Sequence, residues 1–239
     1  MKSLLLLFLK GIIRSFEKII LLYEKRSVFL TVYPDLELDL KKNFSLIKDE
    51  FVTFFEKNES TPFNILSYRA THKILDKKDV YKWKTVFLRA YGRSVKENEI
   101  YFPVTVNLLK KYKNIVSLAF FSCMEPKFTI HTHKGPFKGV LRLHHGLIVP
   151  NSKDIYIIVD NKKYFWKENE TFIFDDTFDH SAHNLTNEKR VVLFLDVIRP
   201  LPFILDKVNR LIINLISITP FVNEIIENNK AFYAQYKKH

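Results

Sequence analysis

Six of the eight histidines in this 239-residue chain fall between positions 131 and 183. They are His131, His133, His144, His145, His180 and His183. Neutral imidazole is the commonest side-chain ligand for metals such as iron, zinc and copper, so this concentration predicts a metal site before any other kind of site. The residues beside each histidine, and the elements that hold them, decide which ones are candidate ligands.

His131 and His133 are two residues apart, which places both side chains on one face of a β-strand. A His-x-His pair could open a metal site of the cupin type, but the glutamate that such a site places a few residues later is missing. A facial triad of two histidines and one carboxylate would require Asp or Glu where Gly135 stands. The residues alone therefore predict a site with two histidine ligands and leave the metal unspecified.

The segment 139–149 sorts its polar residues by strand alternation. Arg142 and His144 point one way, together with Gly146 and Ile148, and suit a polar interior pocket. Leu141, Leu143, His145 and Leu147 point the other way and form an apolar packing face. We therefore expect Arg142 and His144 to belong to the site and His145 to be structural.

Short strands separated by turn residues dominate the chain from residue 115 onward. The expected strands are 115–123, 128–133, 139–149, 155–159, 164–166, 171–174, 180–184 and 190–197. Before them we expect helical spacing over 40–57, a strand from Trp83 to a turn at Gly92, and a helix beginning at Pro103. The pattern predicts a mainly β protein with flanking helices and a core that is a jelly roll or a small barrel.

Both ends of the chain read as amphipathic helices. Residues 1–26 place Leu5, Leu9, Ile12, Phe16, Ile19 and Tyr23 on one face and Lys10, Arg14 and Lys18 on another. Residues 201–239 begin with a helix that places Ile204, Val208, Leu211, Ile212 and Leu215 on one side. Each helix either packs on the central domain, residues 27–200, or contacts a membrane surface. Charged residues interrupt the N-terminal apolar runs, so we expect neither a spanning helix nor a signal peptide.

The net charge of +12 favours an anionic partner such as an anionic membrane surface or an acidic cosubstrate. We expect no nucleic-acid partner, because the lysines are dispersed and no nucleic-acid-binding motif is present. The single cysteine, Cys123, excludes an internal disulfide and fits a reducing compartment. The expected location is cytoplasmic, with peripheral membrane attachment as the alternative.

The segment from Trp83 to Pro200 resembles the aspartyl/asparaginyl β-hydroxylase family of Fe(II)- and 2-oxoglutarate-dependent dioxygenases. The residues that carry the resemblance are Trp83, Tyr91-Gly92, Pro103, Thr105, His133-Lys134-Gly135-Pro136, Leu141-Arg142-Leu143-His144-His145-Gly146-Leu147-Ile148-Val149-Pro150, Trp166, Phe174-Asp175-Asp176-Thr177-Phe178-Asp179-His180, Asn184, Arg190-Val191-Val192-Leu193-Phe194-Leu195-Asp196 and Arg199-Pro200. They cover about half of the chain, in order and at the family's spacing. The resemblance implies a double-stranded β-helix, a cupin-like form of jelly roll.

The resemblance also implies roles for individual residues. His133 and His180 would bind Fe(II), and Gly135 would replace the usual acidic ligand. Arg190 would pair with the distal carboxylate of 2-oxoglutarate, and Arg142, His144 and Ser122 would line the pocket of that cosubstrate. Asp176 and Trp166 would support the site without binding the metal, and His145 departs from the leucine usual in the family. With O2 as the second cosubstrate, such a site hydroxylates an unactivated carbon.

Two substrate classes occur among similar proteins. One is the β-carbon of Asp or Asn in a peptide or protein, which is our first expectation for this chain. The other is a lipid acyl chain, as in the lipid A hydroxylases, which the short chain and amphipathic ends favour. Those lipid hydroxylases usually keep an acidic residue where Gly135 stands. A non-catalytic β-barrel binding module with membrane-contacting helices remains the alternative from another class.

Overall fold

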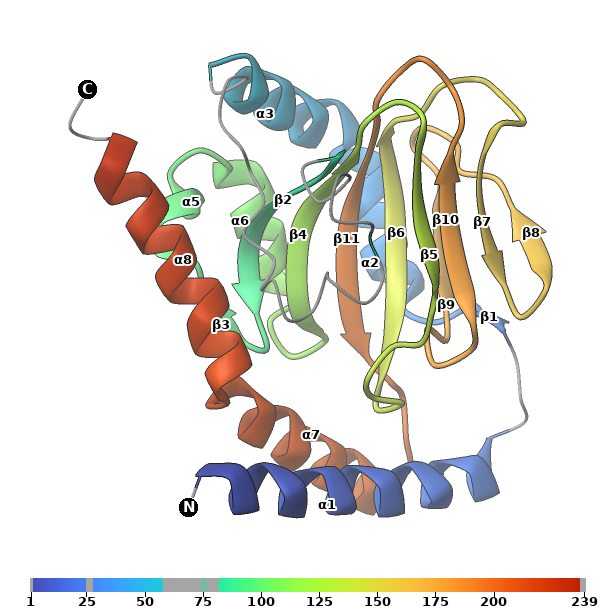
Figure 1. The fold of residues 1–239 in the computed structure, drawn as a ribbon, viewed down its shortest axis with the longest axis vertical. Coiled ribbons are helices and arrows are strands. Elements are labelled where there is room, and N and C mark those ends of the chain that lie inside the picture. The colour runs from blue at the N-terminus through green and yellow to red at the C-terminus, as the bar shows by residue number, and fades with distance from the viewer. Residues whose placement is uncertain (1, 25–27, 58–74, 76–81, 237–239) are drawn as a thin grey trace.

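Two antiparallel sheets form the centre of the protein. The computed structural model describes residues 2–24, 28–57, 75 and 82–236. The larger sheet has the order β1-β9-β6-β11-β4-β2-β3 (Figure 1). Its strands are β1 (Phe29–Leu30), β9 (Thr171–Phe174), β6 (Val140–Ile148), β11 (Arg190–Ile198), β4 (Val116–Met124), β2 (Trp83–Ala90) and β3 (Arg93–Ser94).

The smaller sheet has the order β5-β10-β7-β8. Its strands are β5 (Phe128–His133), β10 (His180–Asn184), β7 (Ile155–Val159) and β8 (Lys162–Tyr164). From β4 to β11 the chain passes back and forth between the two sheets, whose inner faces share one hydrophobic cluster. This alternation is that of a jelly roll, so the predicted fold class, mainly β with flanking helices around a double-stranded β-helix, is confirmed.

A row of stacked aromatic rings crosses the inner face of the larger sheet. Phe87 on β2 stacks on Phe120 of β4, with centroids 4.6 Å apart, and Phe120 stacks on Phe194 of β11 at 4.1 Å. His144 on β6 continues the row at 4.9 Å from Phe194. Alternation requires this arrangement, because every second residue of a strand faces the same way. The row gives the polar residues at its end a rigid and apolar support.

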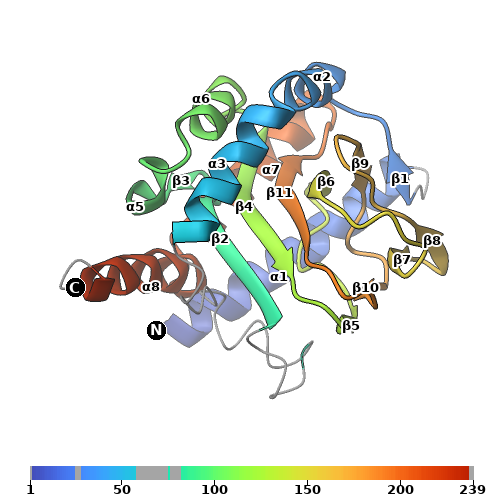
Figure 2. The same cartoon turned by 90° about the horizontal axis from the view of Figure 1, so that it is seen from above.

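Helices α2 (Pro34–Lys42), α3 (Phe44–Lys57), α5 (Lys96–Glu99) and α6 (Pro103–Lys111) flank the larger sheet on its outer side (Figure 2). Phe51 of α3, for example, lies 5.2 Å from Phe121 of β4. The helical spacing expected from residue 40 to 57 is divided between α2 and α3, because the first helix ends at Asn43. The strand from Trp83 and the helix from Pro103 lie where the sequence predicts them.

The remaining helices are α1 (Lys2–Tyr23), α7 (Phe203–Ser217) and α8 (Pro220–Tyr236). Among the described side chains of α1, Phe16 and Ile20 are buried, whereas Ile19 and Tyr23 of the expected apolar face are exposed. Leu5 and Leu9 lie outside the described side chains. No helix in the described part of the chain is long and apolar enough to span a bilayer.

Helix α7 packs on the sandwich through only part of the apolar side that the periodicity predicts. Its buried residues are Asn209, Ile212 and Ile213, and of the five residues expected on one apolar side only Ile212 is buried. The reason is Asn209, whose side-chain amide donates a 2.7 Å hydrogen bond to the backbone oxygen of Gly139. A polar residue fixes the inward side of a helix that is apolar on two sides, which helical periodicity does not reveal.

Candidate functional site

The candidate site lies between the two sheets. The larger sheet contributes β6 and β11, where Arg142 pairs in register with Asp196 and His144 with Phe194. The smaller sheet contributes the end of β5 and the start of β10, where His133 and His180 are register partners. The fold therefore brings together residues as far apart in the sequence as His133 and Asp196.

His133 and His180 lie side by side, with ring centroids 4.1 Å apart. The Nδ1 of His133 is 2.8 Å from the backbone oxygen of His131, and the Nδ1 of His180 is 3.0 Å from that of Phe178. A carbonyl oxygen only accepts hydrogen bonds, so Nδ1 carries the proton in both rings. Each Nε2 then keeps its lone pair free, which is the arrangement of a metal-binding histidine.

Both imidazoles are neutral at physiological pH. Burial, the neighbouring His133 and Arg142 lower the pKa of His180 to about 3. Burial is also the main cause of a lowered pKa at His133, and Arg142 adds to it. Neutral imidazole is the form that binds metals, so the pair is ready for a cation without having to release protons.

In the described part of the chain, no group of three or more His, Cys, Asp and Glu side chains is arranged to hold a metal ion. The geometry thus agrees with a two-histidine site rather than a three-residue facial triad. The two free imidazole nitrogens fit Fe(II), and the remaining coordination positions would be open to a chelating cosubstrate, oxygen or water. The choice of iron over zinc or copper rests on the family resemblance.

Steric packing explains why position 135 holds a glycine. Its backbone N–H donates a 2.7 Å hydrogen bond to the backbone oxygen of Asp176. A Cβ atom at position 135 would lie 1.8 Å from Oδ2 of Asp176 and 2.1 Å from its Cγ. The Asp176 carboxylate therefore fills the space that a side chain at position 135 would need. An acidic ligand at position 135 is incompatible with this packing.

Arg142 is held between two buried carboxylates. Its Nη2 lies 2.8 Å from Asp176, and its Nε lies 3.1 Å from Asp196. Its guanidinium also stacks 4.4 Å above the ring of Phe194. Burial raises the pKa of Asp176 to about 7, and Arg142 opposes this effect. Contact between Arg142 and the cosubstrate remains a prediction, and the structure adds a second task, the positioning of Asp176.

In the described part of the chain, Arg190 has no such carboxylate partner. It is buried, and Nη1 donates a 3.3 Å hydrogen bond to the backbone oxygen of Ser122, while its Nε is buried without a hydrogen-bond partner. Its guanidinium stacks 4.4 Å above the ring of Trp166. Burial lowers the pKa of Arg190 to about 9, so it stays charged at pH 7. A buried cation without an anion costs several kcal/mol, which marks this position as an anion site.

His144 offers a second unmatched donor beside Trp166. The indole N–H of Trp166 donates a 3.2 Å hydrogen bond to Nδ1 of His144. The proton of the neutral ring is then on Nε2, which is buried with no partner. Burial, Arg190 and Arg142 all lower the pKa of His144 and keep it neutral. His144 and Arg190 thus present free N–H groups to the same interior space.

The other predicted residues fall into two groups. Ser122 lies on β4 next to Arg190, and its hydroxyl accepts a 2.9 Å hydrogen bond from Trp83. His145 lies on the outer face of the sheet, 6.0 Å from the ring of Phe44 and 2.8 Å from the hydroxyl of Thr171. The structure therefore brings Ser122 to the site and places His145 outside it.

Sequence reasoning did not single out Asp196, which pairs with Arg142. Its signal was present, because Asp196 is the charged residue in an apolar strand and lies six residues after Arg190, on the same strand face. It also missed the buried cluster in which Asp175 binds Lys138 and Arg199, while Arg199 also binds Glu24. Only the fold brings these four residues together.

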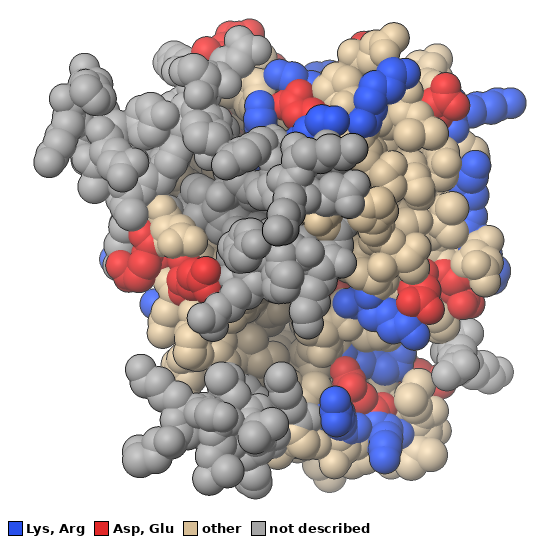
Figure 3. Space-filling model, in the orientation of Figure 1, with Lys and Arg blue, Asp and Glu red and all other residues tan. Residues whose placement is uncertain are grey.

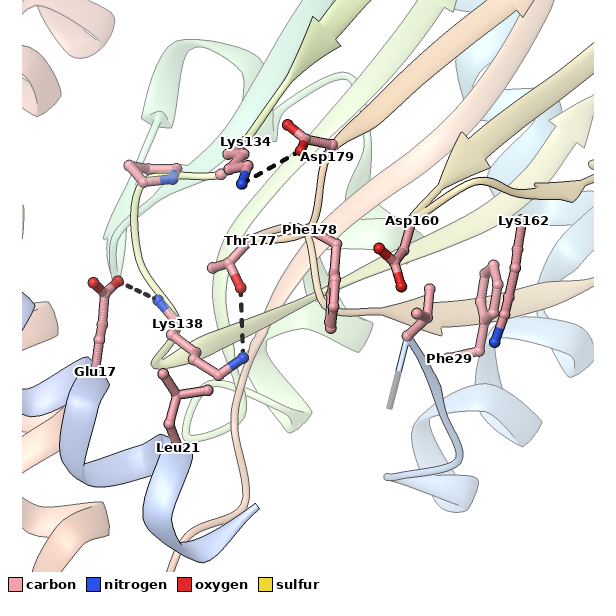
Figure 4. A pocket seen from close by; sticks show the side chains of 13 residues that line it. Glu17, Leu21, Phe29, Lys134, Lys138, Asp160, Lys162, Thr177, Phe178 and Asp179 are labelled. Carbon is pink, nitrogen blue, oxygen red and sulfur yellow. Dashed lines mark hydrogen bonds and ion pairs between the residues drawn. The ribbon is translucent and has the colours of Figure 1, made fainter. Parts of the chain in front are cut away.

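A pocket of about 760 Å³ lies beside the two histidines (Figure 4). One wall consists of residues 134–136, which follow His133, and residues 177–179, which precede His180. Glu17 and Leu21 of α1 form another wall. Figure 4 shows the ion pair between Lys134 and Asp179, which is 3.4 Å long and joins the residues that adjoin His133 and His180 in the sequence. A substrate that reaches the histidines from this side would contact both the β-sandwich and α1.

The comparisons agree on one family. The chain is 41% identical over 159 residues to an ornithine lipid ester-linked acyl 2-hydroxylase of Rhizobium tropici, over 64% of this chain and 56% of that protein. It is 28% identical to the human aspartyl/asparaginyl beta-hydroxylase, over 71% of this chain and 22% of that protein. Among solved structures, the Schizosaccharomyces pombe Cnp3 cupin domain overlaps 34% of this chain and 56% of its own, with 15% identity and a TM-score of 0.30. The fold assignment rests on the two sheets themselves.

The chain spans about half of the Rhizobium tropici relative and about a fifth of the human one. The family model for aspartyl/asparaginyl beta-hydroxylase matches residues 41–200, which include the two histidines, Arg142, His144 and Arg190 but not the pocket residues of α1. That is more than half of the chain and agrees with the resemblance found in the motifs. This protein therefore belongs to the aspartyl/asparaginyl β-hydroxylase family.

Proposed function

We propose that the protein is an Fe(II)- and 2-oxoglutarate-dependent dioxygenase that hydroxylates an unactivated carbon of a lipid acyl chain. The observation that carries the cosubstrate assignment is Arg190, a buried charged guanidinium with no carboxylate partner among the described residues. A dicarboxylate that reaches Arg190 with one end and the histidine pair with the other would satisfy both. A planar guanidinium is well suited to bind a carboxylate through two parallel hydrogen bonds.

The part played by the chain is to bind and orient. His133 and His180 would hold Fe(II) through their Nε2 atoms, and Arg190 and the N–H of His144 would bind carboxylate oxygens of 2-oxoglutarate. Bound together, iron and cosubstrate would use O2 to supply an oxidant strong enough to hydroxylate a C–H bond, with release of succinate and carbon dioxide. The aromatic rings of Phe120, Phe174 and Phe194 wall the interior and exclude water from it.

His144 can serve as the second hydrogen-bond donor to the cosubstrate only if its imidazole stays neutral and keeps one orientation. Trp166 achieves both for His144, because its N–H occupies Nδ1 and leaves the Nε2 proton pointing into the site. The lowered pKa of His144 keeps the ring neutral throughout the physiological range. Arg190 and His144 therefore form a rigid donor set that requires no reorganisation when an anion binds.

The acyl-chain substrate is supported by the relative from Rhizobium tropici, which is named for that activity and is more similar to this chain than the human protein is. The pocket beside the histidines adds support, because one of its walls is α1, an amphipathic helix. Hydroxylation of Asp or Asn in a peptide remains the second candidate. The match to the human aspartyl/asparaginyl beta-hydroxylase favours it.

The decisive experiment is an anaerobic titration of the purified protein with Fe(II) and 2-oxoglutarate. We expect the weak visible charge-transfer absorption of the chelate, followed by succinate release when oxygen is admitted. His180→Ala should abolish both signals. His183→Ala is the matched control, because His183 lies on the same strand, stacked on Tyr156 at 4.7 Å and outside the histidine pair.

Equal loss of signal in the His180→Ala and His183→Ala proteins would contradict the assigned metal ligands. Absence of any chelate absorption in the wild-type protein would refute the dioxygenase proposal itself. The substrate is tested separately, by mass spectrometry of lipid extracts and of proteins from cells with and without the gene. Hydroxylation adds one oxygen atom, and we expect the added mass in the lipid fraction rather than in peptides.

A further inference from the structure

Helix α7 exposes a continuous apolar strip. Ile204, Val208, Leu211, Leu215 and Ile218 recur at intervals of three and four residues, so they lie on one side of the helix and its C-cap, and we name them the α7 stripe. Ile204 is 73% exposed, Leu211 59% and Ile218 67%. The opposite side of α7 packs into the core through Ile212 and Ile213. Contiguous exposed apolar surface of this kind marks a site of interaction.

The outward side of α1 repeats the pattern. Leu22 is 83% exposed, and Ile19 is exposed beside it, whereas Phe16 and Ile20 face the core. The basic residues Arg14 and Lys18 are exposed on the same helix. Figure 3 shows Lys and Arg side chains over the C-terminal half of α1. An apolar strip with basic residues beside it is the composition of a helix that lies in a membrane interface.

The two helices lie at the same end of the molecule, the lower end in Figure 1. Their buried residues belong to one hydrophobic cluster, so their exposed sides both face away from the sandwich at that end. The pocket beside the histidine pair opens along α1, with Glu17 and Leu21 in its wall. The apolar surface and this pocket are therefore neighbours.

We propose that the α7 stripe and the outward side of α1 dock on a bilayer that carries anionic lipid. Docking would set the pocket at the level of the lipid headgroups, so that an acyl chain could reach the histidines without leaving the membrane fully. The idea that docking brings an acyl chain to the pocket rests on the proposed function. The docking itself does not, because it can be measured in the absence of iron and 2-oxoglutarate.

Charge favours a bilayer over a second copy of the chain. Lys207, stacked 4.3 Å above the ring of Phe203, lies next to the α7 stripe. Arg14 and Lys18 lie on the exposed part of α1. A dimer through this surface would bring the basic residues of two copies close together, whereas anionic headgroups would neutralise them.

The test is co-sedimentation of the full chain with vesicles of phosphatidylcholine, with and without phosphatidylglycerol. We expect binding that requires phosphatidylglycerol and weakens as salt is raised. The double variant Ile204→Glu/Leu211→Glu should bind roughly 100-fold more weakly. It removes two apolar side chains that would be buried in the bilayer, and its carboxylates are repelled by the anionic headgroups. Both positions are exposed, so the fold should survive, and thermal unfolding checks this.

Leu38→Glu/Leu46→Glu is the matched control. Leu38 on α2 and Leu46 on α3 are 49% and 53% exposed, and they lie on helices outside the proposed surface. This control should bind vesicles like the wild type. Equal binding by the two double variants would overturn the proposal. So would sedimentation of the wild type as a dimer that Ile204→Glu/Leu211→Glu converts to a monomer, since the stripe would then be a protein interface.

Discussion

Replacement of Arg190 by methionine should stabilise the protein without ligand and abolish the effect of 2-oxoglutarate. Arg190 is a charged residue in a fully buried position, and its only hydrogen-bond acceptor among the described residues is the backbone oxygen of Ser122. Methionine is unbranched and of similar length, so it can lie against Trp166 without the charge. The same change would remove the proposed carboxylate partner of the cosubstrate.

The magnitude follows from the pKa of Arg190, which burial lowers from 12.5 to about 9. A lowered pKa in the folded state means that folding disfavours the charged form of this base. Because pH 7 lies below both values, the whole penalty of about 5 kcal/mol applies. The hydrogen bond to Ser122 and the stacking on Trp166 return roughly 3 kcal/mol. The net gain on removing the charge is therefore about 2 kcal/mol.

The assay is thermal unfolding with and without 2-oxoglutarate, in the presence of Fe(II) and without oxygen. In a protein of this size a gain of 2 kcal/mol raises Tm by about 4–8 °C. The wild type should gain a similar amount from 2-oxoglutarate at roughly 100 times its Kd, and the Arg190→Met protein should gain nothing. Succinate release by the variant should be lost as well.

Arg142→Met is the matched control, because Arg142 is buried but paired with Asp176 and Asp196. Its removal leaves two buried carboxylates without a cation and should destabilise the protein by about 3–5 kcal/mol. The reasoning would be refuted if Arg190→Met lowered Tm as much as Arg142→Met. It would also be refuted if Arg190→Met kept the response to 2-oxoglutarate.

Two further changes test the packing around the site. Gly135→Ala should destabilise the protein by about 1–3 kcal/mol and lower succinate release, because the added Cβ would overlap the Asp176 carboxylate. Gly11→Ala is the control: its Cβ would meet nothing within 4 Å, so this change should neither destabilise the protein nor lower succinate release. His145→Leu should reduce the loss of stability in acid, because burial lowers the pKa of His145 to about 4. The unfolded chain binds a proton below about pH 6.5 while the folded chain resists it, so His145 costs about 2 kcal/mol at pH 5 relative to pH 8. Urea unfolding at the two pH values measures this, and an unchanged loss in the variant would contradict it.

The sequence by itself determined the fold class and predicted the candidate site residues. Alternation in strands such as 139–149 separated Arg142 and His144 from His145, because a strand with one polar and one apolar side has only one way to face a core. The motifs around His133, His180 and Arg190 gave the family, and the match over residues 41–200 confirmed it. Local periodicity and short motifs carry this information without any long-range contact.

Only the tertiary structure decided how these residues are paired. Both arginines lie on the inner face. Among the described residues, Arg142 pairs with one carboxylate from β11 and one from the β9–β10 connection, and Arg190 pairs with none. Likewise, the outward side of α7 depends on the contact of Asn209 with Gly139, 70 residues away. How deeply a charged side chain is buried, and whether an opposite charge lies beside it, depends on residues from several separate elements. A local sequence pattern therefore does not predict either property. The chemistry proposed here depends on that sum, since the unpaired cation and the free imidazole nitrogens exist only in the folded chain.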